Sequence, residues 1–314
     1  MIDFKVANVL LSDEPQFLGS PMMLCRSTKP WYRSTDNEWL LKGPGTHDFM
    51  TFFNALSIQK WRKYTVADAY RLHVELKGST CTLFQTRADS FSYYSEPIFD
   101  TKLIIPASDE WQSFDIDLVA GEKDVITSFK LETTGDVEIR NSYYSAAVEE
   151  GQVRDVELAL CTTTFKKEEY ITRNIGLVKN QILGCNDLIS KHFTMHVVDN
   201  GRTLDVDSLS SEGVEIHPND NAGGAGGFAR GMIEAMEQAP KATHVLLMDD
   251  DVLVSTESIK RTFNLLSIVN DEYSEAFISG AMMNMDEPYI RWEEMGFMNF
   301  EGACRSIKPV ARMD

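Results

Sequence analysis

Three consecutive aspartates, Asp249, Asp250 and Asp251, directly follow the apolar run at 245–248. Adjacent carboxylates repel one another, so a positive group is expected among them. Residues spaced i, i+2 on an extended chain point to the same side, which places Asp249 and Asp251 together and turns Asp250 away. Oxygen ligands suit a hard divalent cation such as Mn²⁺ or Mg²⁺. The pattern predicts a metal site at Asp249 and Asp251, and the alternative is an acidic loop cap without a ligand.

A glycine-rich stretch, NDNAGGAGGFARG (219–231), is the second feature that could bind a ligand. Glycines at the predicted start of a helix let the backbone approach a bound group closely. The stretch is not a dinucleotide fingerprint, because Ala229 takes the sixth place of a G-x-G-x-x-G that begins at Gly224. It is not a P-loop either, because no Gly-Lys-Ser/Thr follows. A nicotinamide-dependent dehydrogenase is therefore disfavoured, and a flexible turn is the plain alternative.

Alternating strands and helices over residues 151–314 must position these groups. Continuous apolar or β-branched segments predict strands at 156–162, 193–200, 214–219, 244–249 and 276–282. Apolar residues at helical spacing lie between them, for example Ile171, Ile175, Val178 and Ile182. This alternation predicts a Rossmann-like α/β sheet, in which ligands bind at the carboxyl ends of the strands. Asp199 and the aspartate triplet both lie at such ends.

Residues 1–150 show a different pattern, with short alternating or β-branched segments separated by Gly, Asp or Pro. The predicted strands are 70–78, 81–88, 91–100, 113–119, 126–135 and 136–146. Such close spacing predicts an antiparallel, jelly-roll-like β-sandwich. We therefore expect two domains, an all-β domain at 1–150 and an α/β domain at 151–314.

The charge and cysteine content narrow the class of protein. The net charge is −18, with both halves acidic, which argues against a nucleic-acid partner. Five scattered cysteines form no CxxC pair or Cys/His cluster, so neither a zinc motif nor a disulfide framework is predicted. No apolar run reaches the roughly 20 residues of a membrane span, and Asp3 with no basic region before the first apolar run is unlike a signal peptide. A cytoplasmic location is the simplest expectation.

The order of four motifs resembles a known family of enzymes. CTTTF (161–165), VVDNG (197–201), the glycine-rich stretch and VLLMDDDV (245–252) are similar to the GT-A fold of family 2 inverting glycosyltransferases, a Rossmann-like fold for nucleotide-diphospho-sugar transfer. FFNALSIQKWRKYT (52–65), ahead of a β-rich domain, resembles the N-terminal region of the bacterial galactofuranosyltransferases related to mycobacterial galactofuranosyltransferase 2. The resemblance implies transfer of galactofuranose from UDP-galactofuranose to a growing cell-wall or surface glycan.

The resemblance also implies roles for individual residues. Asp249 and Asp251 match the metal-binding pair, and Asp199 matches an aspartate that contacts uridine. Phe165 and Lys167 match a Phe-x-Arg that holds the base, although Lys cannot reproduce the bidentate contacts of Arg. Glu293 and Glu294, in YIRWEEMGF (289–297), match a segment near the sugar and are the catalytic candidates. The remaining residues expected around the donor are Thr163, Asn221, Gly224 and Asp250.

One part of the family pattern has no counterpart. The family carries its catalytic Asp base and a metal-binding His after the aspartate triplet, and neither is recognisable here. We therefore expect a fragment of a longer enzyme or a chain without activity. The resemblance implies a lipid-linked acceptor and peripheral contact with the inner face of the membrane, and a homo-oligomer is left open.

The sequence is compatible with two other functions. Another family 2 transferase would use UDP-glucose, UDP-GlcNAc or dTDP-rhamnose as its donor. A non-catalytic carbohydrate-binding protein would instead bind glycan through aromatic residues of the β-rich half, where core packing is the default role of tryptophan. The tryptophans of that half are Trp31, Trp39, Trp61 and Trp111.

Overall fold

The computed structural model describes residues 1–14, 17, 19–90, 95–293, 296–298, 300, 304–306 and 310–313. The chain forms two compact units. One unit comprises Met1–Gln152 together with Ile268–Asp314, and the other comprises Val153–Ser267. Residues 268–314, which we expected in the α/β domain, are thus grouped with the β-rich part of the chain.

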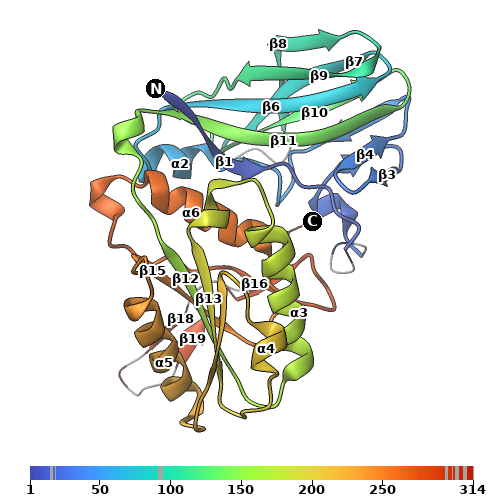
Figure 1. Ribbon diagram of the computed structural model, residues 1–314. Helices are drawn as coiled ribbons and strands as arrows, with labels where there is room; N and C mark the ends of the chain where they lie inside the picture. Colours follow the sequence, from blue (N-terminus) through green and yellow to red (C-terminus); the bar gives the residue numbers. More distant parts are fainter. Residues whose placement is uncertain are drawn as a thin grey trace. The chain divides into compact units, whose positions relative to one another are not determined.

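Two antiparallel sheets dominate the first unit (Figure 1). One sheet has the order β3-β4-β11-β6-β9, with β1 also paired to β11, and the other has the order β2-β5-β10-β7-β8. The strand bounds are β1 Ile2–Asn8, β2 Arg26–Ser27, β3 Trp31–Thr35, β4 Glu38–Leu41, β5 Gly45–Asp48, β6 Ala69–Gly78, β7 Cys81–Ala88, β8 Glu96–Ile105, β9 Ser108–Asp117, β10 Ile126–Thr133 and β11 Val137–Val148.

Side-chain alternation explains why these strands form a sandwich. Along β6, Tyr70, Leu72, Val74 and Leu76 are buried while the residues between them are partly exposed, as expected when one sheet face packs on a core. The two sheets also meet through a buried polar contact, because the Tyr144 hydroxyl on β11 lies 3.1 Å from the Ser128 hydroxyl on β10. The antiparallel, sandwich-like architecture expected for the β-rich part is present.

The rest of the first unit is made of short elements. The helical elements are η1 Pro21–Met23, α2 Ile58–Tyr64, η2 Glu150–Gln152 and η5 Asp271–Tyr273. The short strands are β16 Met282–Met283, β17 Ile290–Glu293, β18 Gly296–Met298, β19 Cys304–Ser306 and β20 Ala311–Arg312. These strands form two small antiparallel sheets, β16-β17-β20 and β18-β19.

The second unit contains a parallel sheet of four strands in the order β14-β13-β12-β15. Its strands are β12 Leu158–Thr164, β13 Phe193–Asp199, β14 Val214–Pro218 and β15 His244–Asp249. Its helical elements are α3 Glu168–Val178, the π-helix η3 Lys179–Leu183, η4 Leu188–Lys191, α4 Val206–Leu209, α5 Gly223–Glu237 and α6 Thr256–Ile268. The four segments predicted as strands before residue 250 therefore form this sheet.

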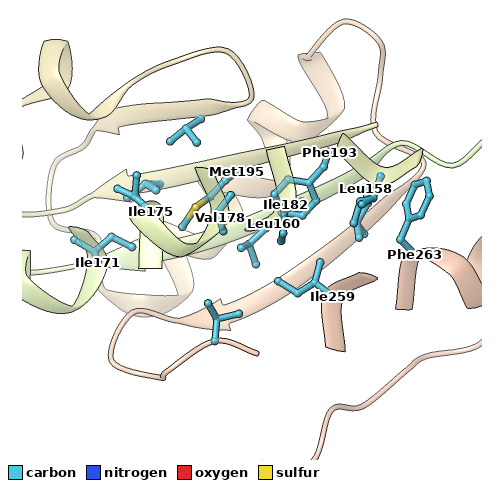
Figure 2. Packing of buried hydrophobic residues seen from close by; sticks show 14 of the residues in the cluster. Leu158, Leu160, Ile171, Ile175, Val178, Ile182, Phe193, Met195, Ile259 and Phe263 are labelled. Atoms are coloured by element: carbon cyan, nitrogen blue, oxygen red, sulfur yellow. The ribbon is translucent and has the colours of Figure 1, made fainter. Parts of the chain in front are cut away.

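The two faces of the parallel sheet are packed differently. Large apolar residues of β12 and β13 pack against α3 and α6, for example Leu160 against the cluster that includes Ile175 and Phe263 (Figure 2). On the opposite face small residues of β12, Ala159 and Cys161, pack against α5. Both faces of β12 are thus covered, which explains its unbroken apolar sequence.

The Rossmann-like GT-A fold predicted for residues 151–314 is wrong for this chain. Most strands of the described residues lie in antiparallel sheets, and the parallel sheet has four members. The predicted fifth strand at 276–282 does not join it, because Met282–Met283 pairs antiparallel with β17 and Phe277 is fully exposed. An apolar run indicates a buried strand only if a sheet edge is there to pair with it, and periodicity carries no information about that edge.

Candidate functional site

The carboxyl ends of the parallel strands bring several of the predicted residues to one edge of the sheet. In the strand register, Thr163 lies beside Asp249 and Thr164 lies beside Asp199. Asp199 in turn lies beside Pro218 at the end of β14. The structure therefore gathers the ends of all four parallel strands at one edge. We call the residues at and directly after these strand ends the strand-end site.

The three aspartates of the strand-end site alternate in exposure. Asp249 and Asp251 are exposed, whereas Asp250 is 8% exposed. This is the arrangement expected for two carboxylates that face solvent on either side of one that turns inward. Two accessible oxygen ligands are therefore available at the end of β15.

Lys167 provides the positive charge among the aspartates. Its Nζ lies 2.5 Å from Asp251 Oδ2 and 3.7 Å from Asp250 Oδ1. The hydrogen bond from Lys167 lowers the pKa of Asp251 below its usual value, and the same bond raises the pKa of Lys167. Lys167 is the residue that precedes α3, so the loop after β12 brings it to the triplet. Phe165 in the same loop is half exposed, and the Lys166 ammonium lies 5.2 Å from the centre of its ring.

A buried amide on α3 holds the backbone that follows β15. Asn174 is fully buried, and its Nδ2 donates to the carbonyl oxygens of Asp250 at 3.1 Å and Val252 at 2.8 Å. Arg173 also donates to the Val252 carbonyl, at 3.1 Å. The amide thereby orients the turn that carries Asp250 and Asp251. Our reading of the sequence missed Asn174, because a single Asn within a helix gives no spacing signal.

Asp199 is engaged by its own loop. The residue is fully buried, and its carboxylate accepts hydrogen bonds from three backbone N–H groups, those of Gly201 at 3.0 Å, Thr203 at 2.7 Å and Leu204 at 2.8 Å. These bonds fold the chain sharply after β13. In this structure the carboxylate therefore organises the loop at the strand-end site.

Asn200 connects three elements of the strand-end site. Its Nδ2 donates to Thr163 Oγ1 at 3.1 Å and to the Gly223 carbonyl at 3.2 Å, while its Oδ1 accepts from Asn219 Nδ2 at 2.9 Å. The ends of β12 and β14 and the start of α5 are thus linked through one side chain. The sequence contained a clue that we did not use, namely an Asn directly after the strand-end Asp199.

The glycines of the 219–231 stretch have different structural roles. A Cβ at Gly227 would lie 2.0 Å from Thr163 Oγ1, and one at Gly231 would lie 3.0 Å from Cys161 Cβ. These two glycines let α5 pack closely on β12. Gly223 has φ +70° and its N–H donates to Asn221 Oδ1, whereas Gly224 has open space where a side chain would be. The open space at Gly224 leaves room for a ligand beside the first turn of α5.

Of the two glutamates proposed near the sugar, the structure describes Glu293. Glu293 lies in β17, which belongs to the first unit. Glu294 lies outside the described residues. The strand-end site as described thus consists of residues from Val153–Ser267 alone.

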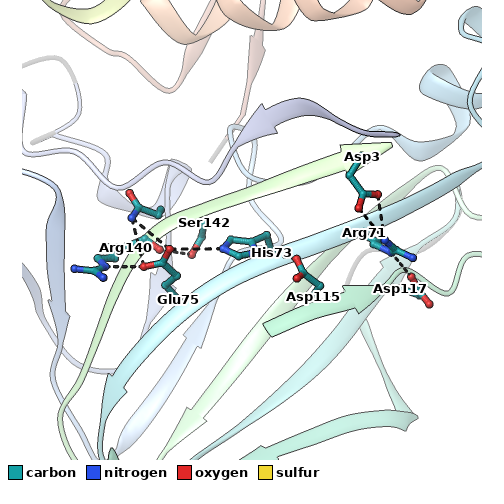
Figure 3. A network of polar contacts seen from close by, with 9 residues as sticks. Asp3, Arg71, His73, Glu75, Asp115, Asp117, Arg140 and Ser142 are labelled. Carbon is teal, nitrogen blue, oxygen red and sulfur yellow. Dashed lines mark hydrogen bonds and ion pairs between the residues drawn. The ribbon is translucent and has the colours of Figure 1, made fainter. Parts of the chain in front are cut away.

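The outer face of the β1-containing sheet in the first unit carries a network of charged groups (Figure 3). Arg71 donates to Asp3 and to Asp117, and His73 Nδ1 lies 2.8 Å from Asp115 Oδ1. Nearby, Arg140 Nε donates to Glu75 Oε2 at 2.6 Å, and Glu75 in turn lies 3.8 Å from His73 Nε2. Arg71 and Arg140 thus pair with carboxylates on other strands, as is common on a solvated sheet face.

Two tryptophans of the first unit, Trp39 and Trp111, have ring faces in contact with cationic side chains. Trp39 is 8% exposed, and the Arg33 guanidinium lies 4.6 Å from the centre of its ring. The Trp111 ring is approached by Arg140 at 4.0 Å and by Lys77 at 4.9 Å. Contacts of this kind occupy ring faces that a sugar would stack on.

The helices of the structure were also compared with what a membrane span requires. Among the residues that it describes, no helix combines the length and the apolar character that crossing a membrane requires.

Sequence comparisons relate the chain to glycosyltransferases. No protein-family model matches the sequence. Over 248 residues, which are 76% of this chain, the sequence is 25% identical to galactofuranosyltransferase GlfT2 of Mycolicibacterium smegmatis. It is 22% identical over 259 residues to galactofuranosyltransferase GlfT2 of Mycobacterium tuberculosis. In both cases the match covers 37% of the relative's length.

Comparisons of the structure find a phage tailspike domain and carbohydrate-binding modules, all at low similarity. The enzymatically active domain of bacteriophage CBA120 tailspike protein 4 matches 45% of this chain and 22% of that one, at a TM-score of 0.32 and 13% identity. The CBM22-1 xylan-binding domain of Paenibacillus barcinonensis Xyn10C matches 47% of this chain and 94% of that one, at a TM-score of 0.29 and 9% identity. These are not nucleotide-sugar transferases, and TM-scores this low carry no argument about function. By sequence, the chain is a distant relative of glycosyltransferases.

Proposed function

We propose that this protein acts in glycosyl transfer and that its strand-end site binds a nucleoside diphosphate sugar through a divalent cation. The observation that carries the proposal is the pair of exposed carboxylates, Asp249 and Asp251, at the ends of parallel strands. Ligands of open parallel sheets bind at this position. The distant sequence relationship to galactofuranosyltransferases makes UDP-galactofuranose our proposed donor.

The residues present fit a Mn²⁺ or Mg²⁺ ion. Asp249 and Asp251 would supply two oxygen ligands, and such ions commonly complete their shell with waters and substrate phosphates. A bound cation would stabilise the charge of the departing diphosphate. The ion pair between Lys167 and Asp251 would then have to break. The freed ammonium could pair with the same diphosphate. The chain therefore offers two sources of positive charge at one place.

The first turn of α5 is our proposed contact for the phosphates. Helix N-termini present free N–H groups and a partial positive charge, which favour an anion. The open space at Gly224 leaves room for such a group, and Asn221 fixes the preceding backbone by accepting from the Gly223 N–H. Asn200 holds Gly223 in place from the strand side. Phe165 and Lys167, in the loop after β12, are proposed to lie against the base and the diphosphate.

The proposed reaction is an inverting displacement at the anomeric carbon. The acceptor hydroxyl forms the new C–O bond while its proton passes to a general base, and the bond to the diphosphate breaks with release of UDP. Glu293 and Glu294 remain our candidates for contact with sugar hydroxyls. The proposed acceptor is a growing, lipid-linked cell-wall or surface glycan.

Two alternatives define the other outcomes of the test. The same site would also bind UDP-glucose, UDP-GlcNAc or dTDP-rhamnose. These donors differ in groups that Asp249 and Asp251 would not contact. A non-catalytic carbohydrate-binding protein would not need exposed Asp249 and Asp251, and the ring faces of Trp39 and Trp111 are already contacted by cationic side chains. We therefore place nucleotide-sugar binding first.

Calorimetric titration of UDP tests the proposal directly. The titration is run on the full chain with Mn²⁺ and with EDTA, and on Asp249→Asn and Asp251→Asn, which keep the side-chain shape. Asp207→Asn is the matched control, because Asp207 is an exposed aspartate of α4, outside both the triplet and the 219–231 stretch. Binding that requires Mn²⁺, weakens at least tenfold in both triplet variants and persists in the control is the expected result.

The opposite outcomes are equally clear. Equal UDP binding in EDTA and in Asp251→Asn would overturn the metal role of the triplet. Binding of xylan or galactan oligosaccharides without any binding of UDP would favour the carbohydrate-binding alternative. Where UDP binds, titration of UDP-galactofuranose against the three other donors identifies the sugar.

A further inference from the structure

A second cluster of potential ligands lies on the same sheet, away from the aspartates. His196 lies on β13, and Glu215 and His217 lie on the neighbouring strand β14. In the register His196 is opposite Glu215, and Glu215 and His217 are spaced i, i+2, so the three side chains share one sheet face. Because Met195 and Ile216 belong to the core on the other face, this shared face is the one covered by α5.

The three side chains converge on one point. His196 Nδ1 lies 3.1 Å from His217 Nε2 and 3.5 Å from Glu215 Oε2, and His217 Nε2 lies 3.7 Å from the same oxygen. A tetrahedral Zn²⁺ with bonds of about 2.0–2.2 Å separates its ligand atoms by roughly 3.3–3.6 Å. The three distances, 3.1, 3.5 and 3.7 Å, lie in or within about 0.2 Å of that range. Among the described residues, this is the group of three whose ligand atoms lie within 4.8 Å of one another.

The second nitrogen of each imidazole faces an acceptor, as in metal-bound histidines. His196 Nε2 lies 2.7 Å from Gln238 Oε1, and an amide oxygen only accepts, so Nε2 carries the proton and Nδ1 presents a lone pair. His217 Nδ1 lies 3.7 Å from Glu234 Oε1, a carboxylate that is also held by Arg230. Both histidines are thereby oriented with Nδ1 of one and Nε2 of the other toward Glu215.

The alternative for this cluster is a hydrogen bond between the rings. Without a cation, two lone pairs 3.1 Å apart would repel, so His217 Nε2 would have to carry a proton and donate it to His196 Nδ1. In that arrangement both rings are neutral, so they provide no positive charge to pair with the Glu215 carboxylate beside them.

We propose that His196, Glu215 and His217 form a Zn²⁺ site. Imidazole and carboxylate ligands suit Zn²⁺, whereas Mg²⁺ prefers oxygen alone. His196 is fully buried, but Glu215 is half exposed, which gives the ion an entry path. The site would fasten the edge strand β14 to β13 beneath α5. It lies three residues before Asp199 on β13, about 10 Å along the strand at the usual rise, and is independent of nucleotide binding.

Zinc titration of the full chain, stripped with EDTA and desalted, tests this site. Stoichiometry is measured by elemental analysis, affinity by calorimetry, and geometry by the visible bands of Co²⁺ in place of Zn²⁺. Glu215→Gln is the principal variant because Glu215 is exposed enough to leave the fold intact, and His217→Gln is the second. Glu212→Gln, an exposed glutamate just before β14, is the matched control.

One Zn²⁺ per chain, a tetrahedral Co²⁺ spectrum and a rise in Tm with zinc are expected for the wild type and for Glu212→Gln. Glu215→Gln is expected to bind at least tenfold more weakly, since loss of a ligand exceeds the 10–100-fold effect of outer-shell changes. Equal affinity in Glu215→Gln and the wild type, or no stoichiometric binding in the wild type, overturns the site. Loss of zinc binding in Asp249→Asn/Asp251→Asn, with Glu215→Gln unaffected, would assign the ion to the aspartates instead.

Discussion

Lys167 Nζ lies 2.5 Å from Asp251 Oδ2, so a side chain from the loop after β12 supplies positive charge to the aspartate triplet at the end of β15. The sequence led us to expect a metal ion in that role. The structure shows that the Lys167 ammonium also places positive charge there. Lys167 and a divalent cation therefore compete for Asp251 in our proposal.

Replacing Lys167 with Gln is expected to raise the pKa of Asp251 toward the ordinary aspartate value. The shift follows because the hydrogen bond from Lys167 is the main cause of the depressed pKa. Carboxyl NMR titration measures it directly. Lys166→Gln is the matched control, because Lys166 lies over Phe165 instead. An unchanged Asp251 pKa in Lys167→Gln would contradict the contact.

The same pair gives a pH dependence of stability. A depressed folded-state pKa stabilises the protein above the unfolded value, which is about 3.9 for aspartate, and this contribution disappears as pH falls through the folded pKa. We expect the difference in urea midpoint between wild type and Lys167→Gln to be present at pH 6 and to vanish in strong acid. If the difference in urea midpoint between the two proteins grew on acidification, the ion pair would not be its cause.

Gly227→Ala is expected to destabilise the second unit by about 1–3 kcal/mol, the usual cost of overpacking. The added Cβ would lie 2.0 Å from Thr163 Oγ1, so α5 would have to move away from β12. Urea unfolding followed by circular dichroism measures the loss. Gly224→Ala is the control, because open space surrounds that position, and it should cost nothing. Equal effects of the two substitutions would argue against the close packing.

Asn200→Ala is expected to cost about 1–3 kcal/mol, because it leaves polar groups of the strand-end site without their partner. The groups affected are Thr163 Oγ1, the Gly223 carbonyl and Asn219 Nδ2. Thermal unfolding measures the change, and UDP affinity should fall with it because the start of α5 loosens. Asn221→Ala, which removes the single bond to the Gly223 N–H, should have the smaller effect on stability.

Asn174→Ala is expected to weaken Mn²⁺-dependent UDP binding although Asn174 contacts neither ligand in our proposal. Its two hydrogen bonds to the carbonyls of Asp250 and Val252 orient the turn of the triplet. Calorimetry at a temperature where both proteins are folded separates this effect from a loss of stability. Arg173→Ala, which leaves both bonds of Asn174 intact, should be milder. Full UDP affinity in Asn174→Ala would show that the turn keeps its shape unaided.

Local periodicity accounts for the part of the fold that could be predicted. Continuous apolar segments predicted the strands that became β12 to β15, and parallel strands necessarily gather Asp199 and Asp249 at one edge. The segment at 276–282 had the same apolar character and yet did not join the sheet. The difference depends on which sheet edge is available, and this is a property of the whole fold.

The positioning residues of the strand-end site could not be predicted in the same way. Asn174 and Asn200 act by hydrogen bonds to groups far away in the sequence, such as the Val252 carbonyl and Thr163. An amide with such partners needs no particular spacing, so the sequence contains no pattern to recognise. The roles of the glycines were also hidden, because Gly224 and Gly227 look alike until the distance to Thr163 is known.

The two faces of β12 should differ in the substitutions that they tolerate over evolutionary time. On the face toward α3 and α6, Leu158 and Leu160 lie among other large apolar side chains, where exchanges among Leu, Ile and Met can be absorbed by neighbours. On the face toward α5, Cys161 meets Gly231 with no spare room. We therefore expect substitutions in this unit to be tolerated better on the α3 and α6 side of the sheet than on the side that faces α5.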